Sequence, residues 1–265
     1  MAVAKRLGWV QTTSTGVGQS VKKLGLQESD VVITTARGVH AGPLAEFVMM
    51  ALLLHFRGLR HLDAEQKAQR WVRYCGEEVA GRSIAIVGAG DLARGIAKAA
   101  RGFDMRVVAV ARDKAKDRAH NALFDAVYGA AELHQALRQA DAVVVTLPHT
   151  LETERMVDAA AFAAMKKGAA FVNIGRGQVI DEAALVENLQ SGHLGFAALD
   201  VAEVEPLPQG HPLWSMPNVL ISPHSASTVA TENVKITEIF CYNLSCRLDG
   251  RIADMKNRLD KRLMY

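Results

Sequence analysis

Three polar side chains follow apolar segments of the kind that form buried strands. Arg176 comes after Ala-Ala-Phe-Val-Asn-Ile-Gly, Glu205 lies beyond Gly-Phe-Ala-Ala-Leu-Asp, and His224 follows Asn-Val-Leu-Ile-Ser-Pro. Parallel sheets bind ligands outside the carboxyl ends of their strands, so we expect these three groups at one edge of a sheet. A guanidinium suits a carboxylate and an adjacent carbonyl. A carboxylate beside an imidazole favours the protonated ring and fixes its tautomer, which a proton donor needs at neutral pH.

A glycine-rich turn precedes these groups in the chain. The segment Ile-Val-Gly-Ala-Gly-Asp-Leu-Ala-Arg places Gly88, Gly90 and Ala93 in the pattern G-x-G-x-x-G/A, between a strand and a helix. Such a turn brings a pyrophosphate against backbone N–H groups at the start of the helix, where Asp91 and Leu92 lie. The pattern predicts a dinucleotide site. A methyltransferase is an alternative for the turn alone, but it leaves the later strand-end residues unexplained.

The end of the next strand bears on which dinucleotide is bound. A site selective for NAD places an acid about 20 residues after the turn, on the ribose 2′-hydroxyl. Here Ala111 and Arg112 occupy that place, and a guanidinium binds a 2′-phosphate through two parallel hydrogen bonds. We therefore favour NADP(H) over NAD(H). The alternative is that Asp113 accepts from the ribose and Arg112 is simply solvated.

The elements that position these groups follow a regular alternation. Six segments rich in Val and Ile predict strands, at 83–88, 106–111, 141–147, 169–175, 195–200 and 218–222. Helical segments between them lie at 91–103, 131–140, 158–168 and 181–192. Strands that alternate with helices predict an α/β fold with a doubly wound parallel sheet of the Rossmann type.

The chain outside that sheet predicts a second, smaller domain. Upstream, 8–13 and 30–35 are expected strands, and 42–59 is an expected long helix. The chain closes with a helix expected over 227–248. We assign residues 41–226 to a dinucleotide-binding domain, and 1–40 with 227–265 to a substrate domain.

Composition excludes several other classes of protein. The chain has 265 residues, 49% of them hydrophobic, and a net charge of +3, which is too small to indicate nucleic-acid binding. The N-terminus has no apolar signal segment and the longest apolar run is too short to span a bilayer, so we expect no membrane partner and a cytoplasmic location. The three cysteines lack metal-binding spacing, and no metal site is predicted.

The order of these motifs resembles the NAD(P)-dependent D-isomer specific 2-hydroxyacid dehydrogenases, a family that includes glyoxylate/hydroxypyruvate reductases. The matching segments are Gly-Ala-Gly-Asp-Leu-Ala-Arg, Asn-Ile-Gly-Arg-Gly-Gln-Val-Ile-Asp, Ala-Leu-Asp-Val-Ala-Glu-Val-Glu-Pro and Ser-Pro-His-Ser-Ala-Ser. They run over almost the whole chain. The resemblance implies hydride transfer from NAD(P)H to a small 2-oxo acid, giving the D-2-hydroxy acid. It does not specify which acid.

The resemblance also implies roles for individual residues. Arg176 would bind the carboxylate and carbonyl of the substrate, and His224 would donate a proton to the carbonyl oxygen with Glu205 hydrogen-bonded to it. Asp200 would contact the nicotinamide carboxamide. Further cofactor contacts are implied for Leu147, Pro148 and Ile174.

A loop near the N-terminus, Gln-Thr-Thr-Ser-Thr-Gly-Val-Gly, resembles the segment that holds the substrate carboxylate in this family. That assigns Thr15 and Gly16 to substrate binding, although an ordinary glycine-rich turn is an equal alternative. Family members usually carry further residues before this point, so we expect a substrate domain that lacks its first elements. The resemblance further implies a homodimer. Trp71 and Trp214 are candidates for the substrate pocket, and equally for core or dimer contacts.

A binding module is the alternative function. Dinucleotide-sensing proteins that resemble the C-terminal-binding-protein corepressors keep the same three catalytic positions. Turnover compared with cofactor-dependent association on one sample separates the two functions.

Overall fold

The computed structural model describes residue 4, residues 6–114 and residues 122–262. The chain divides into two compact units. One comprises Ala41–Ser227, and the other comprises Met1–His40 together with Thr228–Tyr265.

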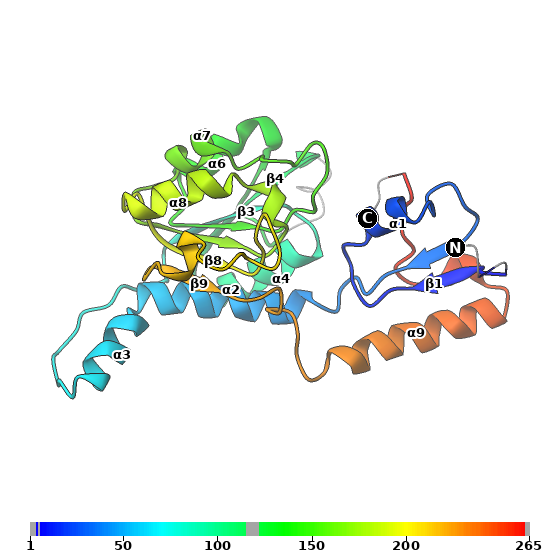
Figure 1. The fold of residues 1–265 in the computed structure, drawn as a ribbon, viewed down its shortest axis with the longest axis horizontal. Helices are drawn as coiled ribbons and strands as arrows, with labels where there is room; N and C mark the ends of the chain where they lie inside the picture. Colours follow the sequence, from blue (N-terminus) through cyan, green and yellow to red (C-terminus); the bar gives the residue numbers. More distant parts are fainter. Residues whose placement is uncertain (1–3, 5, 115–121, 263–265) are drawn as a thin grey trace. The chain divides into compact units, whose positions relative to one another are not determined.

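The Ala41–Ser227 unit is built on a parallel sheet with the strand order β5-β4-β3-β6-β7-β8-β9 (Figure 1). Its strands are β3 (Ser83–Val87), β4 (Arg106–Ala111), β5 (Ala126–Gly129), β6 (Ala142–Val145), β7 (Ala169–Asn173), β8 (Leu194–Leu199) and β9 (Val219–Ile221). The order reverses between β3 and β6, as in a doubly wound sheet. The predicted Rossmann-type fold is confirmed.

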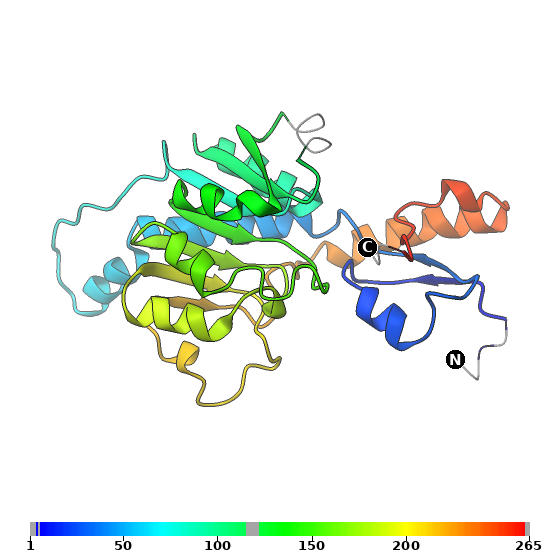
Figure 2. The same ribbon diagram turned by 90° about the horizontal axis from the view of Figure 1, so that it is seen from above.

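Helices cover both faces of this sheet (Figure 2). One face carries α2 (Ala41–Phe56) and α4 (Asp91–Arg101). The other carries α6 (Leu133–Arg138), α7 (Ala159–Ala164) and α8 (Glu182–Gln190). Because both faces are buried, the central strands are continuous apolar runs, as their sequences indicated.

The edge strand β5 was not predicted. Its four residues, Ala-Val-Tyr-Gly, are only half-buried and pair with β4 alone. An edge strand this short lacks the long apolar run that identified the central strands. The other six strands were predicted within two residues at each end.

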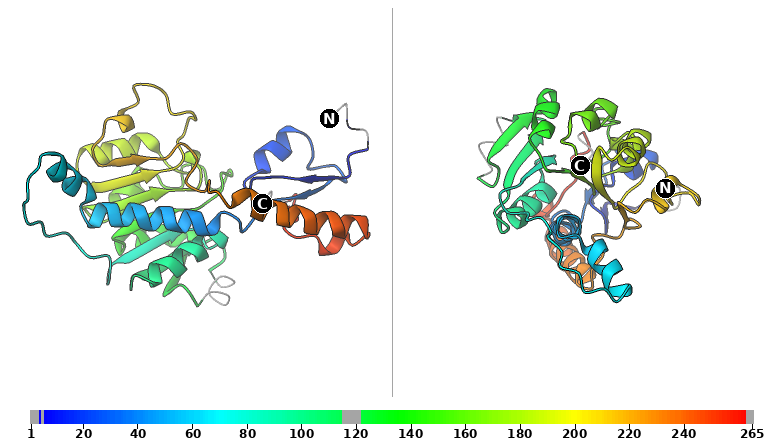
Figure 3. Two further views of the ribbon diagram at one scale, coloured as in Figure 1. Left: turned by 90° about the horizontal axis from the view of Figure 1, so that it is seen from below. Right: turned by 90° about the vertical axis from the view of Figure 1, so that its left-hand side faces the viewer.

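The segment between α2 and β3, residues 57–82, is called the arm here; it leaves the end of α2 and extends away from the layered part of this unit (Figure 3). It contains α3 (Leu59–Lys67), a helix with no buried residue that the sequence did not indicate. Within the described ranges, no single helix has the length and apolar composition needed to cross a membrane. Only α2 and α3 taken together meet that test, and they are bent by 62°.

The other unit contains two parallel strands, β1 (Trp9–Gln11) and β2 (Val32–Thr34). Around them lie α1 (Gly18–Lys23) and α9 (Glu232–Leu248). The start of α9 was predicted at Ser227 and is found five residues later, because the chain up to its N-cap, Thr231, is in turns and irregular structure. Val21, Ile33 and Leu259 share a small apolar core.

Candidate active site

The glycine-rich turn between β3 and α4 has the shape of an anion cradle. Gly88 has φ +126°, and a Cβ there would lie 2.2 Å from Oγ1 of Thr146, so a side chain is excluded. Gly90 is the N-cap of α4 and supplies no side-chain cap, and a Cβ added to it would meet nothing within 4 Å. The first N–H groups of a helix have no partner within it, and the space beside Gly90 is open, so the residues present fit a dinucleotide.

Three side chains surround this turn. Arg94 contacts the carboxylate of Asp91, and its Nη1 lies 3.4 Å from the carbonyl of Ala89. Leu92 packs against the core, so its backbone is the candidate cofactor contact. Sequence reasoning missed Arg94. The one sequence feature that could have singled out Arg94 is its place as a cationic residue in the first helical turn after the glycines.

The neighbouring strands end beside the turn. Arg112 and Asp113 directly follow β4 and are both exposed, whereas Ala111 is buried. Leu147 and Pro148 follow β6, and Leu147 is half-buried against the core.

The loop after β7 presents Arg176. Asn173 is fully buried, and its side chain bonds within the loop: Oδ1 accepts from the Gly175 N–H at 3.0 Å, and Nδ2 donates to the Arg176 carbonyl at 3.1 Å. Arg176 is half-buried, and its Nη1 donates to the carbonyl of Gly175 at 2.6 Å. Ile174 is buried beside it. The sequence did not single out Asn173, although a polar residue that ends an apolar strand was a usable signal.

Glu205 and His224 meet directly. Nδ1 of His224 lies 2.7 Å from Oε2 of Glu205. An ionised carboxylate only accepts hydrogen bonds, so Nδ1 carries the hydrogen and donates it. Nε2 is then the ring nitrogen that exchanges a proton with a substrate. The two side chains are 47% and 38% exposed, which gives a small molecule access to them.

The backbone around His224 is held in an uncommon conformation. Its φ is +52°, in the left-handed region, where strain is a recurrent feature of functional sites. The N–H of His224 donates to the carbonyl of Asp200 at 2.8 Å. Oδ1 of Asp200, a buried carboxylate, accepts from the N–H groups of Ser225 and Ala226. Asp200 therefore orients the turn that presents the histidine.

Thr15 and Gly16 belong to the other unit, in the exposed loop between β1 and α1. Oγ1 of Thr15 lies 3.3 Å from Nδ1 of His40, and Nε2 of His40 lies 3.0 Å from a carboxylate oxygen of Glu232.

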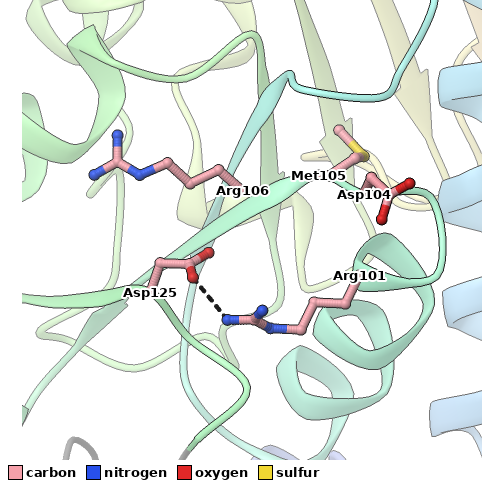
Figure 4. Close-up of a pocket in the computed structure, with 5 residues that line it drawn as sticks. All are labelled: Arg101, Asp104, Met105, Arg106 and Asp125. Carbon is pink, nitrogen blue, oxygen red and sulfur yellow. Dashed lines mark hydrogen bonds and ion pairs between the residues drawn. The ribbon is translucent and has the colours of Figure 1, made fainter.

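A surface recess elsewhere in the Ala41–Ser227 unit lies away from this chemistry. Figure 4 shows it at the amino end of β4, lined by Arg101, Asp104, Met105, Arg106 and Asp125. Arg101 and Asp125 form an ion pair there at 2.7 Å. The candidate catalytic groups instead follow carboxyl ends of strands, where doubly wound sheets bind ligands.

Comparison with known proteins gives a consistent match. Residues 49–226 match the family model described as "D-isomer specific 2-hydroxyacid dehydrogenase, NAD binding domain". A curated relative, glyoxylate/hydroxypyruvate reductase B of Escherichia fergusonii, is 34% identical over 252 residues. That match covers 91% of this chain and 71% of the relative.

Solved structures agree with this match. A D-isomer specific 2-hydroxyacid dehydrogenase from Xanthobacter autotrophicus in complex with NADPH is 31% identical, with a TM-score of 0.84, over 100% of this chain and 82% of that one. An NADPH-dependent glyoxylate/hydroxypyruvate reductase from Sinorhizobium meliloti in complex with NADP is 29% identical, with a TM-score of 0.84. That match covers 98% of this chain and 80% of the other.

Replacing Gly90 by Ala tests the anion cradle. The added methyl group meets no atom of the protein, so the free energy of unfolding is expected to change by less than about 1 kcal/mol. The methyl group enters the open space beside the turn, so the dissociation constants of NADPH and NADH are expected to rise at least about tenfold, since a pyrophosphate must approach the backbone closely. Fluorescence titration measures both constants. Gly42→Ala, also free of clashes, is the matched control, and unchanged affinity in Gly90→Ala contradicts the assignment.

Proposed function

This chain belongs to the D-isomer specific 2-hydroxyacid dehydrogenases, a family of oxidoreductases that use a nicotinamide dinucleotide, and we propose that it reduces glyoxylate or hydroxypyruvate with NADPH. The observation that carries the proposal is the 2.7 Å contact between His224 and Glu205, on loops that follow adjacent strands of the same sheet as the Arg176 loop. The names of the curated and structural relatives support the choice of substrate.

Each of the three groups has a distinct task in this proposal. The Arg176 guanidinium binds the carboxylate of the 2-oxo acid and its carbonyl oxygen, which orients the carbonyl carbon for attack. Nε2 of protonated His224 gives its proton to the carbonyl oxygen. Throughout, Nδ1–H of His224 stays hydrogen-bonded to Glu205, which stabilises the imidazolium before the transfer and orients the neutral ring after it. When bound, the nicotinamide supplies the hydride that the carbonyl carbon accepts. Thr15 and Gly16 are proposed to bind the substrate carboxylate as well.

The test is the initial rate of NADPH oxidation with glyoxylate and with hydroxypyruvate, in the wild type and in Glu205→Gln. The wild type is expected to turn over. Glu205→Gln is expected to keep its affinity for NADPH and lose about 10²-fold or more in kcat, the range that proton transfer by a positioned side chain contributes. Glu187→Gln, on an exposed face of α8, is the control. A folded wild type that binds NADPH tightly without turnover contradicts the proposal and favours the dinucleotide-sensing alternative.

NADPH is the proposed cofactor because Arg112 directly follows β4, where the adenosine ribose lies in folds of this type. The complexes of the two structural relatives with NADPH and NADP support this preference.

Arg112→Ala tests the preference. A charge-assisted hydrogen bond contributes about 1.5–3 kcal/mol, so kcat/KM for NADPH is expected to fall about 10- to 100-fold while the value for NADH changes little. Asp113→Asn is the matched variant for the alternative. If Asp113 accepts from the ribose, Asp113→Asn lowers kcat/KM for NADH instead, and Arg112→Ala leaves kcat/KM for NADPH unchanged.

We also propose that the protein is a homodimer in which the arm is covered by a second copy. A nine-residue helix with no buried residue is not stable by itself in water, so α3 needs a partner surface. The arm also exposes Leu59, Leu62, Val72 and Tyr74, and the side chain of Trp71 is fully exposed. These five large apolar side chains all lie between residues 59 and 74, and exposed apolar surface of this kind supports an interaction surface there.

Trp71→Glu tests the dimer by light scattering after size-exclusion chromatography. The wild type is expected at twice the chain mass of 28.7 kDa, and Trp71→Glu is expected to shift toward a single chain, because a buried unpaired carboxylate opposes association. Leu151→Glu is the control, since Leu151 is 93% exposed and lies outside the arm. A wild type that elutes as a single chain contradicts the proposal.

A further inference from the structure

The loop that carries Glu205 has little regular structure of its own. Between the end of β8 and the short 3-10 helix at Pro212–Trp214, the chain has no helix or strand. A loop of this length keeps one conformation only where other side chains hold it. The geometry of the Glu205–His224 pair therefore depends on what anchors residues 201–214.

A buried acid on a neighbouring segment provides that anchor. Glu182, the first residue of α8, is 7% exposed, and a carboxylate at such burial needs partners. Its Oε2 accepts from the N–H of Glu203 at 2.9 Å, and its Oε1 lies 3.4 Å from Nε2 of His211. Glu182 thus contacts the loop on both sides of Glu205.

A purely helical role does not explain these contacts. Acidic residues in the first turn commonly stabilise a helix through its dipole. However, Asp181 already caps α8 by accepting from the N–H of Ala184 at 3.0 Å. Both oxygens of Glu182 point to the loop instead.

The tautomer of His211 agrees with the same arrangement. Nδ1 of His211 accepts from the N–H of Leu213 at 3.4 Å. A ring nitrogen that accepts carries no hydrogen, so the hydrogen of the neutral ring lies on Nε2 and points to Glu182. The histidine joins the end of the loop to the buried carboxylate.

The segment that carries Arg176 also holds the start of the loop. Nε2 of Gln178 donates to the carbonyl of Glu203 at 2.7 Å, and the N–H of Glu203 is held by Glu182, so both backbone groups of Glu203 have a partner. A Cβ on Gly177 would lie 1.8 Å from the carbonyl oxygen of Ala202, so the two backbones are in direct contact. The position of Arg176 is thereby coupled to that of Glu205.

We propose that Glu182 and His211 are positioning residues for the proton donor, which hold the loop 201–214 where Glu205 meets Nδ1 of His224. The role concerns orientation of the ring, so it affects the proton-transfer step and leaves cofactor binding unchanged. This inference rests on the proposed function for its kinetic consequence, and on the bond between Glu205 and His224 for its structural one.

Glu182→Gln tests the proposal. A glutamine side chain has one acceptor oxygen, whereas Glu182 accepts from both the N–H of Glu203 and Nε2–H of His211. We expect kcat to fall about 10- to 100-fold with the dissociation constant of NADPH unchanged. Glu187→Gln, the same change on an exposed face of the same helix, is the control. His211→Ala, which removes the ring donor and keeps Glu182, is the second variant.

Nitrogen-15 spectra of the imidazole rings provide a readout that does not require turnover. The wild type is expected to show His224 with its hydrogen on Nδ1, and Glu182→Gln is expected to weaken that signal. If the wild type lacks turnover but the signal responds, the proposed function fails while the positioning role stands. An unchanged His224 signal in both variants, with only a lower urea midpoint, overturns the positioning role.

Discussion

The parallel pairing of β7, β8 and β9 is the constraint on which the rest of the site depends. Parallel neighbours end at the same edge of a sheet, so the loops that carry Arg176, Glu205 and His224 must leave together. The crossover helices that this pairing requires bury both faces of the sheet, which makes its central strands uniformly apolar. The candidate catalytic groups therefore lie at the carboxyl edge, as does the glycine-rich turn that precedes α4.

Placement at one edge is not enough for proton transfer, which needs atoms within hydrogen-bond distance. Three sets of contacts provide that accuracy. Asn173 shapes the Arg176 loop, Asp200 holds the turn at His224, and Glu182 anchors the loop of Glu205. All three are buried polar residues that hydrogen-bond to the backbone of the loops they support, and Glu182 also contacts the side chain of His211. The site is thus supported by residues that never need to touch a substrate.

Sequence patterns identified the fold and the strand-end residues because both depend on local apolar periodicity and on the topology of a parallel sheet. The half-buried edge strand β5 and the solvent-exposed α3 lack that periodicity and were missed. The roles of Glu182 and His211 were also missed, because their contacts join residues that are about 20 to 30 positions apart in the chain. The contact of the Arg176 guanidinium with the Gly175 carbonyl was also not predicted from the sequence.

Arg176 and the Glu205–His224 pair are proposed to bind one 2-oxo acid together. A crystal structure with NADPH and oxamate, a 2-oxo acid analogue that resists reduction, tests it most directly. We expect the oxamate carboxylate and carbonyl on the Arg176 guanidinium, with Nε2 of His224 about 3 Å from the carbonyl oxygen. Oxamate bound away from Arg176, or a His224 ring turned away from a bound oxamate, would contradict it.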